Sequence, residues 1–405
     1  MLATQSAEMT GFLIISDTHA YVSSATSGTP SFLEVTHTAR PNMIGSLAEL
    51  MANEDLKPEW IVCPGDLGDR ASPEGQAFVW RELNSLKNAI GATHLVGAAG
   101  NHDLDSRFAN SGFDPLQNIK SLRPLFPGRT QAECDQYWAR HYVIYEQADY
   151  RIVNLNSSAF HGYGKVDDKN GKEFEFGRVS EQTIDALKSD LAKADFRYNI
   201  LLTHHHIVSN QHIYAEEYSE MRGGGRLMHR LSEATRSSWF VIHGHLHFPE
   251  IDYGRGASIA PVVFSAGSAS ARSSGGASAS PPNQVYFLEL ADSSDNLDGW
   301  SPCGTIRSWY WSPEGVWAPS PATHKIPDGT GFGTRLNAKQ AADRFENALT
   351  ASGEPYVYFQ EAFDADPLLR YLLPGDLDLA VFELRKRSFK VTFGVQRADS
   401  ILRKA

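Results

Sequence analysis

An α/β fold is the class that the sequence predicts, and two observations support it. Short apolar runs have the length and composition of strands that are buried on both faces. Segments with helical spacing separate several of these runs, so that strands and helices alternate along the chain. The five runs lie at residues 12–15, 60–62, 94–96, 200–202 and 239–242.

Further elements can be assigned in order up to residue 290. We expect helices near residues 43–52 and 76–88, a hairpin of residues 142–146 and 150–155, a helix after Ser180, and strands at residues 259–265 and 284–290. Ser180 can cap its helix because Ile184 and Leu187 follow at helical spacing. The Ser-, Gly- and Ala-rich residues 265–282 cannot build a core. We interpret them as a loop of the first domain, with an interdomain linker as the alternative.

The composition changes near Ala291, and we expect a domain boundary there. Residues 1–292 form the first expected domain, and residues 293–405 form a small α+β accessory domain whose role the sequence does not reveal. The elements expected in the accessory domain are an aromatic-rich hairpin at residues 307–311 and 316–317, a helix at 337–351, and a second hairpin at 379–384 and 389–395.

Length, charge and cysteine content set further limits. The 405 residues suggest two or three domains. The net charge of −11 disfavours binding along an extended stretch of nucleic-acid backbone. A local basic patch is compatible with this net charge. Three separated cysteines form neither a disulfide framework nor a zinc motif, which fits a reducing cytoplasm. The first ten residues do not resemble a signal peptide, and no apolar run approaches the roughly 20 residues of a membrane span. We therefore expect a cytoplasmic protein with no membrane segment.

Five short polar segments follow the predicted strands. They are Asp17-Thr18-His19, Gly65-Asp66-Leu67-Gly68-Asp69-Arg70, Gly100-Asn101-His102-Asp103, Thr203-His204-His205-His206 and Gly244-His245-Leu246-His247. Carboxylate, carboxamide and imidazole groups therefore collect where strands end, which is the edge at which an open α/β sheet carries its chemistry. These groups bind the hard and borderline cations that phosphate oxygens also prefer. The sequence thus indicates a metal site suited to phosphate esters.

The order and content of these segments resemble the calcineurin-like metallophosphoesterase superfamily. The family pattern is D-x-H, G-D-x-x-D, G-N-H-[DE], a lone His after a strand, and G-H-x-H, and all five blocks occur here in order. The resemblance covers roughly the first 250 residues and ends near Leu290. It implies a four-layer α/β/β/α sandwich, to which the C-terminal α+β part would be an appendage.

The resemblance also implies two bound metal ions. It assigns Asp17, His19, Asp66 and His247 to one ion, and Asp66, Asn101, His204 and His245 to the other. Asp66 would bridge the two. Divalent or mixed-valence ions of Mn, Fe, Zn or Ni all suit such mixed oxygen and nitrogen ligands. The family often has Pro at the position of His206, and we expect His205 and His206 to support the site without binding metal.

The catalytic residues are likewise implied by the resemblance. His102 would be the general acid that protonates the leaving oxygen, provided that a carboxylate holds its proton. Asp69 or Asp103 could supply that carboxylate, and Asp69 stands where the serine/threonine phosphatases of this superfamily carry such a residue. Arg70 could clamp phosphate, with an ordinary surface arginine as the alternative. Purple acid phosphatases carry a Tyr ligand at the position of Asp69, so the chain differs from them.

Several functions are compatible with these residues. The leading hypothesis is a phosphodiesterase that hydrolyses a small or nucleotide-like diester through attack of a metal-bound hydroxide. The glycine-rich residues 221–226 favour it, because they resemble class III cyclic-nucleotide phosphodiesterases and glycerophosphodiesterases; Arg222 and Arg226 could face such a substrate. The alternatives are a phosphomonoesterase or protein phosphatase, a nuclease, and an inactive interaction module. The acidic balance argues against a nuclease, and the intact motifs argue against an inactive module.

One basic cluster lies near the C-terminus. It consists of Arg385, Lys386, Arg387, Lys390, Arg397, Arg403 and Lys404. We favour a solvated edge hairpin whose charges prevent pairing with other chains. The alternative is a patch for nucleic acid or for a protein partner, either of which the accessory domain would recruit.

Overall fold

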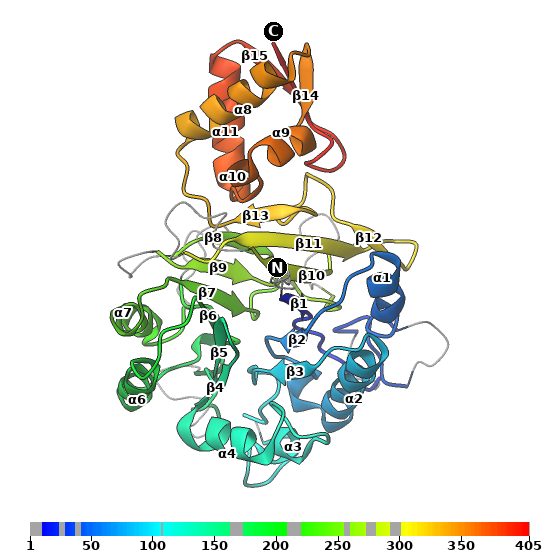
Figure 1. The fold of residues 1–405 in the computed structure, drawn as a ribbon. Coiled ribbons are helices and arrows are strands. Elements are labelled where there is room, and N and C mark those ends of the chain that lie inside the picture. The colour runs from blue at the N-terminus through cyan, green and yellow to red at the C-terminus, as the bar shows by residue number, and fades with distance from the viewer. Residues whose placement is uncertain are drawn as a thin grey trace, which may run out of the picture.

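The computed structural model places two large mixed sheets against each other and a third, small sheet in a separate C-terminal unit (Figure 1). The structure describes residues 10–23, 29–36, 42–106, 108–162, 173–208, 220–254, 260–272, 281–291 and 301–404. The central part of the expected Ser-rich loop, residues 273–280, lies outside these ranges.

The first sheet has the strand order β12-β11-β10-β1-β2-β3, and β13 pairs with β11. Its strands are β1 (Gly11–Ile14), β2 (Trp60–Cys63), β3 (His94–Gly97), β10 (Gln284–Leu290), β11 (Gly304–Trp311), β12 (Trp317–Pro319) and β13 (Thr330–Phe332). The strands β1, β2 and β3 are parallel, so their carboxyl ends meet at one edge. The helices α1 (Leu47–Asn53), α2 (Pro73–Ala89) and α3 (Gln117–Ser121) share a hydrophobic core with this sheet.

The second sheet has the order β4-β5-β6-β7-β9-β8. Its strands are β4 (Tyr142–Glu146), β5 (Tyr150–Leu155), β6 (Tyr198–Leu202), β7 (Trp239–His243), β8 (Glu250–Tyr253) and β9 (Val262–Ser265). The helices α6 (Glu181–Leu191) and α7 (Gly224–Ala234) pack on its outer face, and α4 (Gln131–Arg140) leads into β4. Ser180 accepts a hydrogen bond from the Thr183 amide, as expected for the cap of α6.

Alternating side chains build the layers. Phe12 and Ile14 of β1 face a core that also contains Ile200 of β6, so this core joins the two sheets. Leu13 points to the opposite side, into the core shared with α1 and α2, while Leu201 points into the core shared with α6 and α7. Two-residue alternation is what a strand covered on both faces requires. The four-layer sandwich implied by the resemblance is therefore confirmed.

The strands β11, β12 and β13 lie beyond the expected domain boundary, yet they belong to the first sheet. The expected boundary at residue 292 lies in a segment outside the described residues, but β11 pairs with β10 from Gln284↔Tyr310 to Leu290↔Gly304. The predicted pairing of residues 307–311 with 316–317 is present in the β11–β12 pair. Ile306 and Trp309 are fully buried. We therefore propose that the main unit extends to about Phe332, 40 residues beyond the sequence-based boundary.

The C-terminal unit has a hydrophobic core of its own. Its elements are α8 (Ala338–Ser352), β14 (Tyr356–Tyr358), α9 (Phe359–Ala365), α10 (Pro367–Arg370), α11 (Pro374–Lys386), β15 (Phe389–Thr392) and β16 (Ile401–Lys404). The predicted helix at residues 337–351 is confirmed, since Asn337 caps α8. The strand predicted at 379–384 is wrong, because these residues belong to α11. Leu377, Val381 and Leu384 are buried at helical spacing, and β15 pairs with β16 instead.

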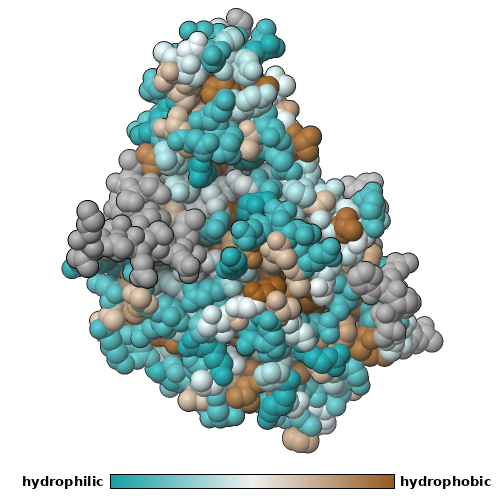
Figure 2. Space-filling view, turned by 45° about the vertical axis from the view of Figure 1, so that its right-hand side comes forward, coloured by the Kyte–Doolittle hydropathy of each residue, from teal (hydrophilic) through white to brown (hydrophobic). Residues whose placement is uncertain are grey.

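The surface shows no broad apolar face in the view of Figure 2, where apolar residues are scattered among hydrophilic ones. Within the described ranges, none of the helices has the length and apolar character that crossing a bilayer requires.

A truncation tests the placement of β11. A chain that ends at residue 292 should lose cooperative thermal unfolding, because it removes Ile306 and Trp309 from the core. Each large buried side chain contributes about 1.5–3 kcal/mol, against a total stability of about 5–15 kcal/mol for a domain. A chain that ends at residue 334 retains β11 to β13 and should unfold cooperatively in circular dichroism. Equal behaviour of the two truncated chains would contradict this assignment.

Candidate functional site

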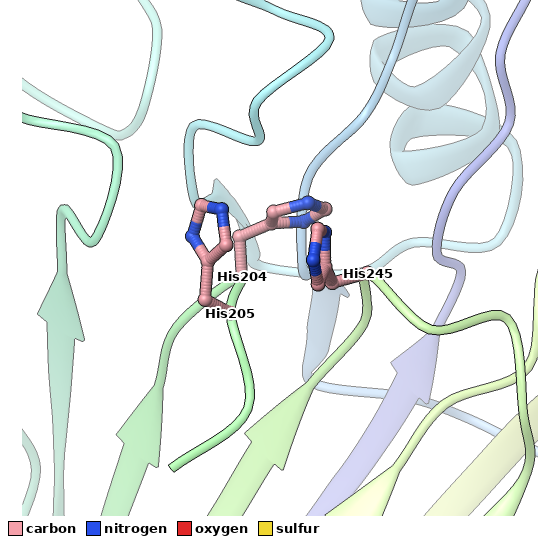
Figure 3. Close-up of side chains that lie close together, drawn as sticks. All are labelled: His204, His205 and His245. Carbon is pink, nitrogen blue, oxygen red and sulfur yellow. The ribbon is translucent and has the colours of Figure 1, made fainter. Parts of the chain in front are cut away.

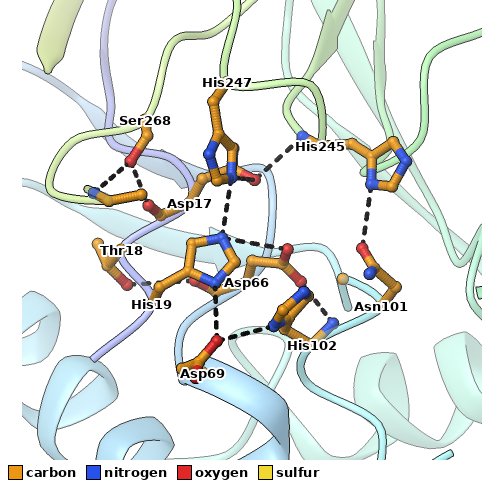
Figure 4. Close-up of polar contacts among 12 residues, drawn as sticks. Asp17, Thr18, His19, Asp66, Asp69, Asn101, His102, His245, His247 and Ser268 are labelled. Carbon is orange, nitrogen blue, oxygen red and sulfur yellow. Dashed lines mark hydrogen bonds and ion pairs between the residues drawn. The ribbon is translucent and has the colours of Figure 1, made fainter. Parts of the chain in front are cut away.

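The candidate metal ligands lie on loops that leave the carboxyl ends of neighbouring strands in both sheets (Figure 4). Asp17 and His19 follow β1, Asp66 follows β2, Asn101 follows β3, His204 follows β6, and His245 and His247 follow β7. The loops meet because the two sheets pack with these ends at a common edge. Residues more than 200 positions apart in the sequence are thereby brought into contact.

The first cluster contains Asp17, His19, Asp66 and His247. The Nε2 atoms of His19 and His247 are 2.9 Å apart. His247 Nε2 is 3.4 Å from Asp17 Oδ1, and His19 Nε2 is 3.4 Å from Asp66 Oδ2. Four donor atoms, one from each residue, lie within 4.8 Å of one another. This spacing suits a single cation at their centre.

The second cluster shares Asp66 with the first. Asn101 Oδ1 is 2.9 Å from His204 Nε2 and 3.0 Å from His245 Nδ1. His204 Nε2 is also 3.4 Å from Asp66 Oδ2, the same oxygen that approaches His19. One carboxylate oxygen therefore lies at equal distances from an imidazole nitrogen in each cluster.

Backbone carbonyls fix which ring nitrogen faces the second cluster. A carbonyl only accepts hydrogen bonds, so His204 donates through Nδ1 to Pro64, and His245 donates through Nε2 to Glu175 of α5 (Glu173–Phe176). The remaining nitrogen of each ring then carries a lone pair, and both lone pairs point at the Asn101 carbonyl oxygen. Three facing lone pairs repel one another unless a cation lies between them. The residues thus fit a bound metal ion.

Burial keeps the imidazoles in the form that binds metal. It lowers the pKa of His19 and of His245 to about 4 and that of His204 well below the ordinary value, so the rings are neutral at pH 7. Burial also raises the pKa of Asp66, and the nearby charges of Asp17 and Asp103 act in the same direction. Burial likewise opposes ionisation of Asp17, but a hydrogen bond from His247 and the surrounding histidines outweigh it and lower its pKa. The buried carboxylates lack a permanent counter-charge, which bound cations would supply.

The backbone of the site is held in a sparsely populated conformation. Five of the seven candidate ligands have positive φ, from 45° at His19 to 73° at His245. Such residues cost roughly 1–3 kcal/mol each and persist only where the surrounding structure enforces them. Two glycines permit the tight packing: a Cβ at Gly100 would lie 2.1 Å from Asp66 Oδ1, and one at Gly244 would lie 2.3 Å from Asp17 Oδ2. The ligand positions are therefore set by the fold.

His102 lies beside the clusters and contacts Asp69. Its Nδ1 is 3.1 Å from Asp69 Oδ1, and its backbone N–H donates to Asp66 Oδ1 at 2.7 Å. Burial opposes a charge on this ring, but Asp66 and Asp69 outweigh it and raise the pKa of His102. Asp103 does not take part, because its oxygens accept backbone N–H groups, including those of Asp66 and Leu67.

Two cavities meet at His102. One, of about 230 Å³, is lined by both metal clusters and by Arg272, a residue that the sequence did not single out. The other, of about 270 Å³, continues past His102 and Asn101 to Arg70, Leu104 and Ala109. The Arg70 side chain is 69% exposed, and its Nε is 3.8 Å from Asp69 Oδ2. A substrate with its phosphorus near the clusters could therefore extend past His102.

His205 lies closer to the site than the sequence suggested. Its ring joins those of His204 and His245 in a third group whose nitrogens lie within 4.8 Å of one another (Figure 3). His205 Nδ1 is 2.8 Å from Ser157 Oγ, while Nε2 is buried and has no hydrogen-bond partner in the part of the chain that the structure describes. His206 lies farther out, with its ring centroid 5.9 Å from that of His245.

The arginines of the glycine-rich segment before α7 pair with glutamates. Arg222 Nη1 is 2.5 Å from Glu173 Oε1, and Arg226 Nε is 2.9 Å from Glu181 Oε2. Gly223 has a φ of 87° and supplies the left-handed residue from which the helix begins. Both arginines therefore form ion pairs in the structure, and their contact with a substrate stays a prediction.

Comparisons with known proteins found a matching family model and several similar solved structures. A family model described as calcineurin-like phosphoesterase matches residues 11–249. Among solved structures, a dimetal phosphatase from Danio rerio is 12% identical, with a TM-score of 0.46 and coverage of 74% of this chain and 95% of that one. The purple acid phosphatase PPD1 from yellow lupin (Lupinus luteus) seeds is also 12% identical, with a TM-score of 0.46 and coverage of 76% and 52%. No curated protein matches the chain.

The family model carries the assignment, because it spans more than half of the chain. The matched residues contain all five motifs and the strands from β1 to β7. The chain belongs to the calcineurin-like phosphoesterase family.

Proposed function

We propose that this phosphoesterase uses two metal ions to hydrolyse phosphodiesters of small or nucleotide-like substrates. The observation that carries the proposal is the position of Asp66. Its Oδ2 lies 3.4 Å from a ring nitrogen in each of two clusters whose other members are imidazole, carboxylate and carboxamide groups. A carboxylate shared in this way suits a pair of cations a few ångströms apart, an arrangement typical of enzymes that cleave phosphate esters.

The protein groups divide the work between binding and proton transfer. The seven ligands would hold the cations, which when bound polarise the phosphoryl group and lower the pKa of water. Asp69 contacts His102 at Nδ1, which leaves Nε2 to give a proton to the leaving oxygen. The raised pKa of His102 keeps that proton available, and its causes include the charge of Asp66 and the hydrogen bond to Asp69.

The second cavity offers room for an organic substituent of a diester. Beyond His102 it is lined by Leu104 and Ala109 together with Asp105 and Ser106. Phosphomonoester hydrolysis is the second candidate function. It is favoured by Arg70, which lies at the same cavity beside Asp69 and could meet the extra charge of a monoester.

A substrate panel tests the proposed preference. The protein should be reconstituted separately with Mn, Fe, Zn and Ni and assayed with bis-nitrophenyl phosphate, nitrophenyl phosphate, cyclic nucleotides and single-stranded DNA. We expect the highest kcat/KM for a small diester. A preference for nitrophenyl phosphate would reject the diester part of the proposal. Absence of hydrolysis with every metal and substrate would reject all of it.

Substitution of two ligands tests the metal assignment. Asp66→Asn removes the shared anion, and His204→Ala removes a nitrogen from the second cluster, so both should abolish hydrolysis and lower the metal content measured by mass spectrometry. Asp55→Asn and His229→Ala change exposed residues of the same types and serve as matched controls. Near-normal turnover with two metals in either site variant would show that its assigned ligand is wrong.

Substitution of His102 separates proton transfer from metal binding. His102→Ala should retain both metals and lose about 10²–10⁴-fold in kcat, which is the usual contribution of a general acid. The loss should be smaller for nitrophenolate than for alkoxide leaving groups, because nitrophenolate leaves without a proton. If both classes of substrate lose the same factor, His102 has another role.

A further inference from the structure

The small C-terminal sheet has one covered face and one open face. Its strand order is β14-β16-β15, and all its pairs are antiparallel. Val357, Leu402 and Phe389, one from each strand, are buried in the core that also contains residues of α8 and α11. Because side chains alternate along a strand, their neighbours point to the opposite face, where each of the three strands carries exposed side chains.

Two tyrosines and two cations occupy this open face. Tyr356 and Tyr358 of β14 are 45% and 39% exposed, and their ring centroids are 5.7 Å apart. Arg403 lies directly opposite Tyr356 on the neighbouring strand β16, and Lys390 lies opposite Arg403 on β15. Arg403 and Lys390 are exposed as well. A row of tyrosine, arginine and lysine therefore crosses all three strands.

The positions of Lys390 and Arg403 bring two positive charges together on adjacent strands. Like charges that lie directly opposite each other on adjacent strands destabilise a sheet. Lys390 and Arg403 form no ion pair within the part of the chain that the structure describes. Protection of a sheet edge explains a charge on β15, but β16 is the central strand and has no free edge. An anionic partner would offset the repulsion between them.

Two other basic residues of the cluster are balanced by acidic side chains. Arg387 pairs with Asp343 of α8, and Lys386 pairs with Glu383 within α11. Arg387 therefore ties two helices together, and the charge on Lys386 is balanced on its own helix. Lys390 and Arg403 instead place positive charge on the open sheet face without an ion pair in the described residues, in a chain whose net charge is −11.

We propose that this open face, made of Tyr356, Tyr358, Arg403 and Lys390, binds single-stranded nucleic acid. Exposed aromatic rings on a sheet stack with unpaired bases, and neighbouring cations contact the phosphates between those bases. A duplex hides its base faces and offers nothing to the tyrosines. An acidic polypeptide would engage the cations but would gain little from the rings. The combination of rings and cations in register therefore favours a single strand over either.

Binding to this face is independent of the metal centre, so it can be measured without hydrolysis. The full-length protein in EDTA should raise the fluorescence anisotropy of labelled oligo-dT or oligo-rU at low salt. Tyr356→Ala and Tyr358→Ala should each weaken binding about fivefold or more, the loss expected when one stacking contact is removed. Tyr356→Phe should retain binding, because a phenyl ring also stacks.

The salt dependence of oligonucleotide binding tests whether Lys390 and Arg403 contact phosphates. Lys390→Ser and Arg403→Ser should each weaken binding and reduce the slope of log K against log salt by about 0.7, the value for one phosphate contact on a single strand. Lys57→Ser and Phe113→Ala change an exposed cation and an exposed aromatic residue of the main unit and should have no effect. Each variant's unfolding temperature confirms that the sheet is intact.

Three results would overturn the proposal. The first is no anisotropy change with either oligonucleotide at low salt. The second is full binding by the Tyr356→Ala, Tyr358→Ala double variant. The third is equally effective competition by duplex DNA or by polyglutamate, which would point to charge alone. Because the assay contains EDTA and no ester is cleaved, none of these results bears on the phosphodiesterase proposal.

Discussion

The carboxylate of Asp66 is the contact on which the site depends. It is almost fully buried at the junction of the two sheets, where Oδ2 approaches His19 and His204 and Oδ1 accepts the His102 amide. A buried carboxylate is unfavourable without positive charge nearby, and burial accordingly raises the pKa of Asp66. The neutral His19 and His204 cannot supply that charge, and His102 supplies only part of it. Cations in both clusters would satisfy Asp66 and would join the two sheets through one residue.

The rest of the fold can be understood as support for that contact. Parallel strands in each sheet end at the same edge, and the core between the sheets sets how far apart the two sets of loops lie. Left-handed backbone at Asp17, Asp66 and His245 is strained, so the surrounding packing must contribute the energy that holds it. Positions fixed before a metal arrives reduce the reorganisation that binding requires.

Much of this arrangement is predictable from the sequence, because each motif follows a short apolar run with the composition of a buried strand. The one misassigned strand has a physical cause. Residues 379–384 form an apolar run that is too short to distinguish a strand from a buried helix, and only the tertiary contacts of α11 decide. The placement of β11 depends on pairing with β10 across a segment that carries no pattern. His205 and Arg272 reach the site through loop geometry, which no local signal in the sequence encodes.

The central claim is that Asp66 bridges two metal ions. Anomalous scattering from crystals of the metal-reconstituted protein tests it directly, because each ion appears as a peak. The account predicts two peaks about 3.5–4 Å apart, both within bonding distance of the Asp66 carboxylate, with His19 on one side and His204 on the other. A single peak, or two peaks of which only one contacts Asp66, would contradict it.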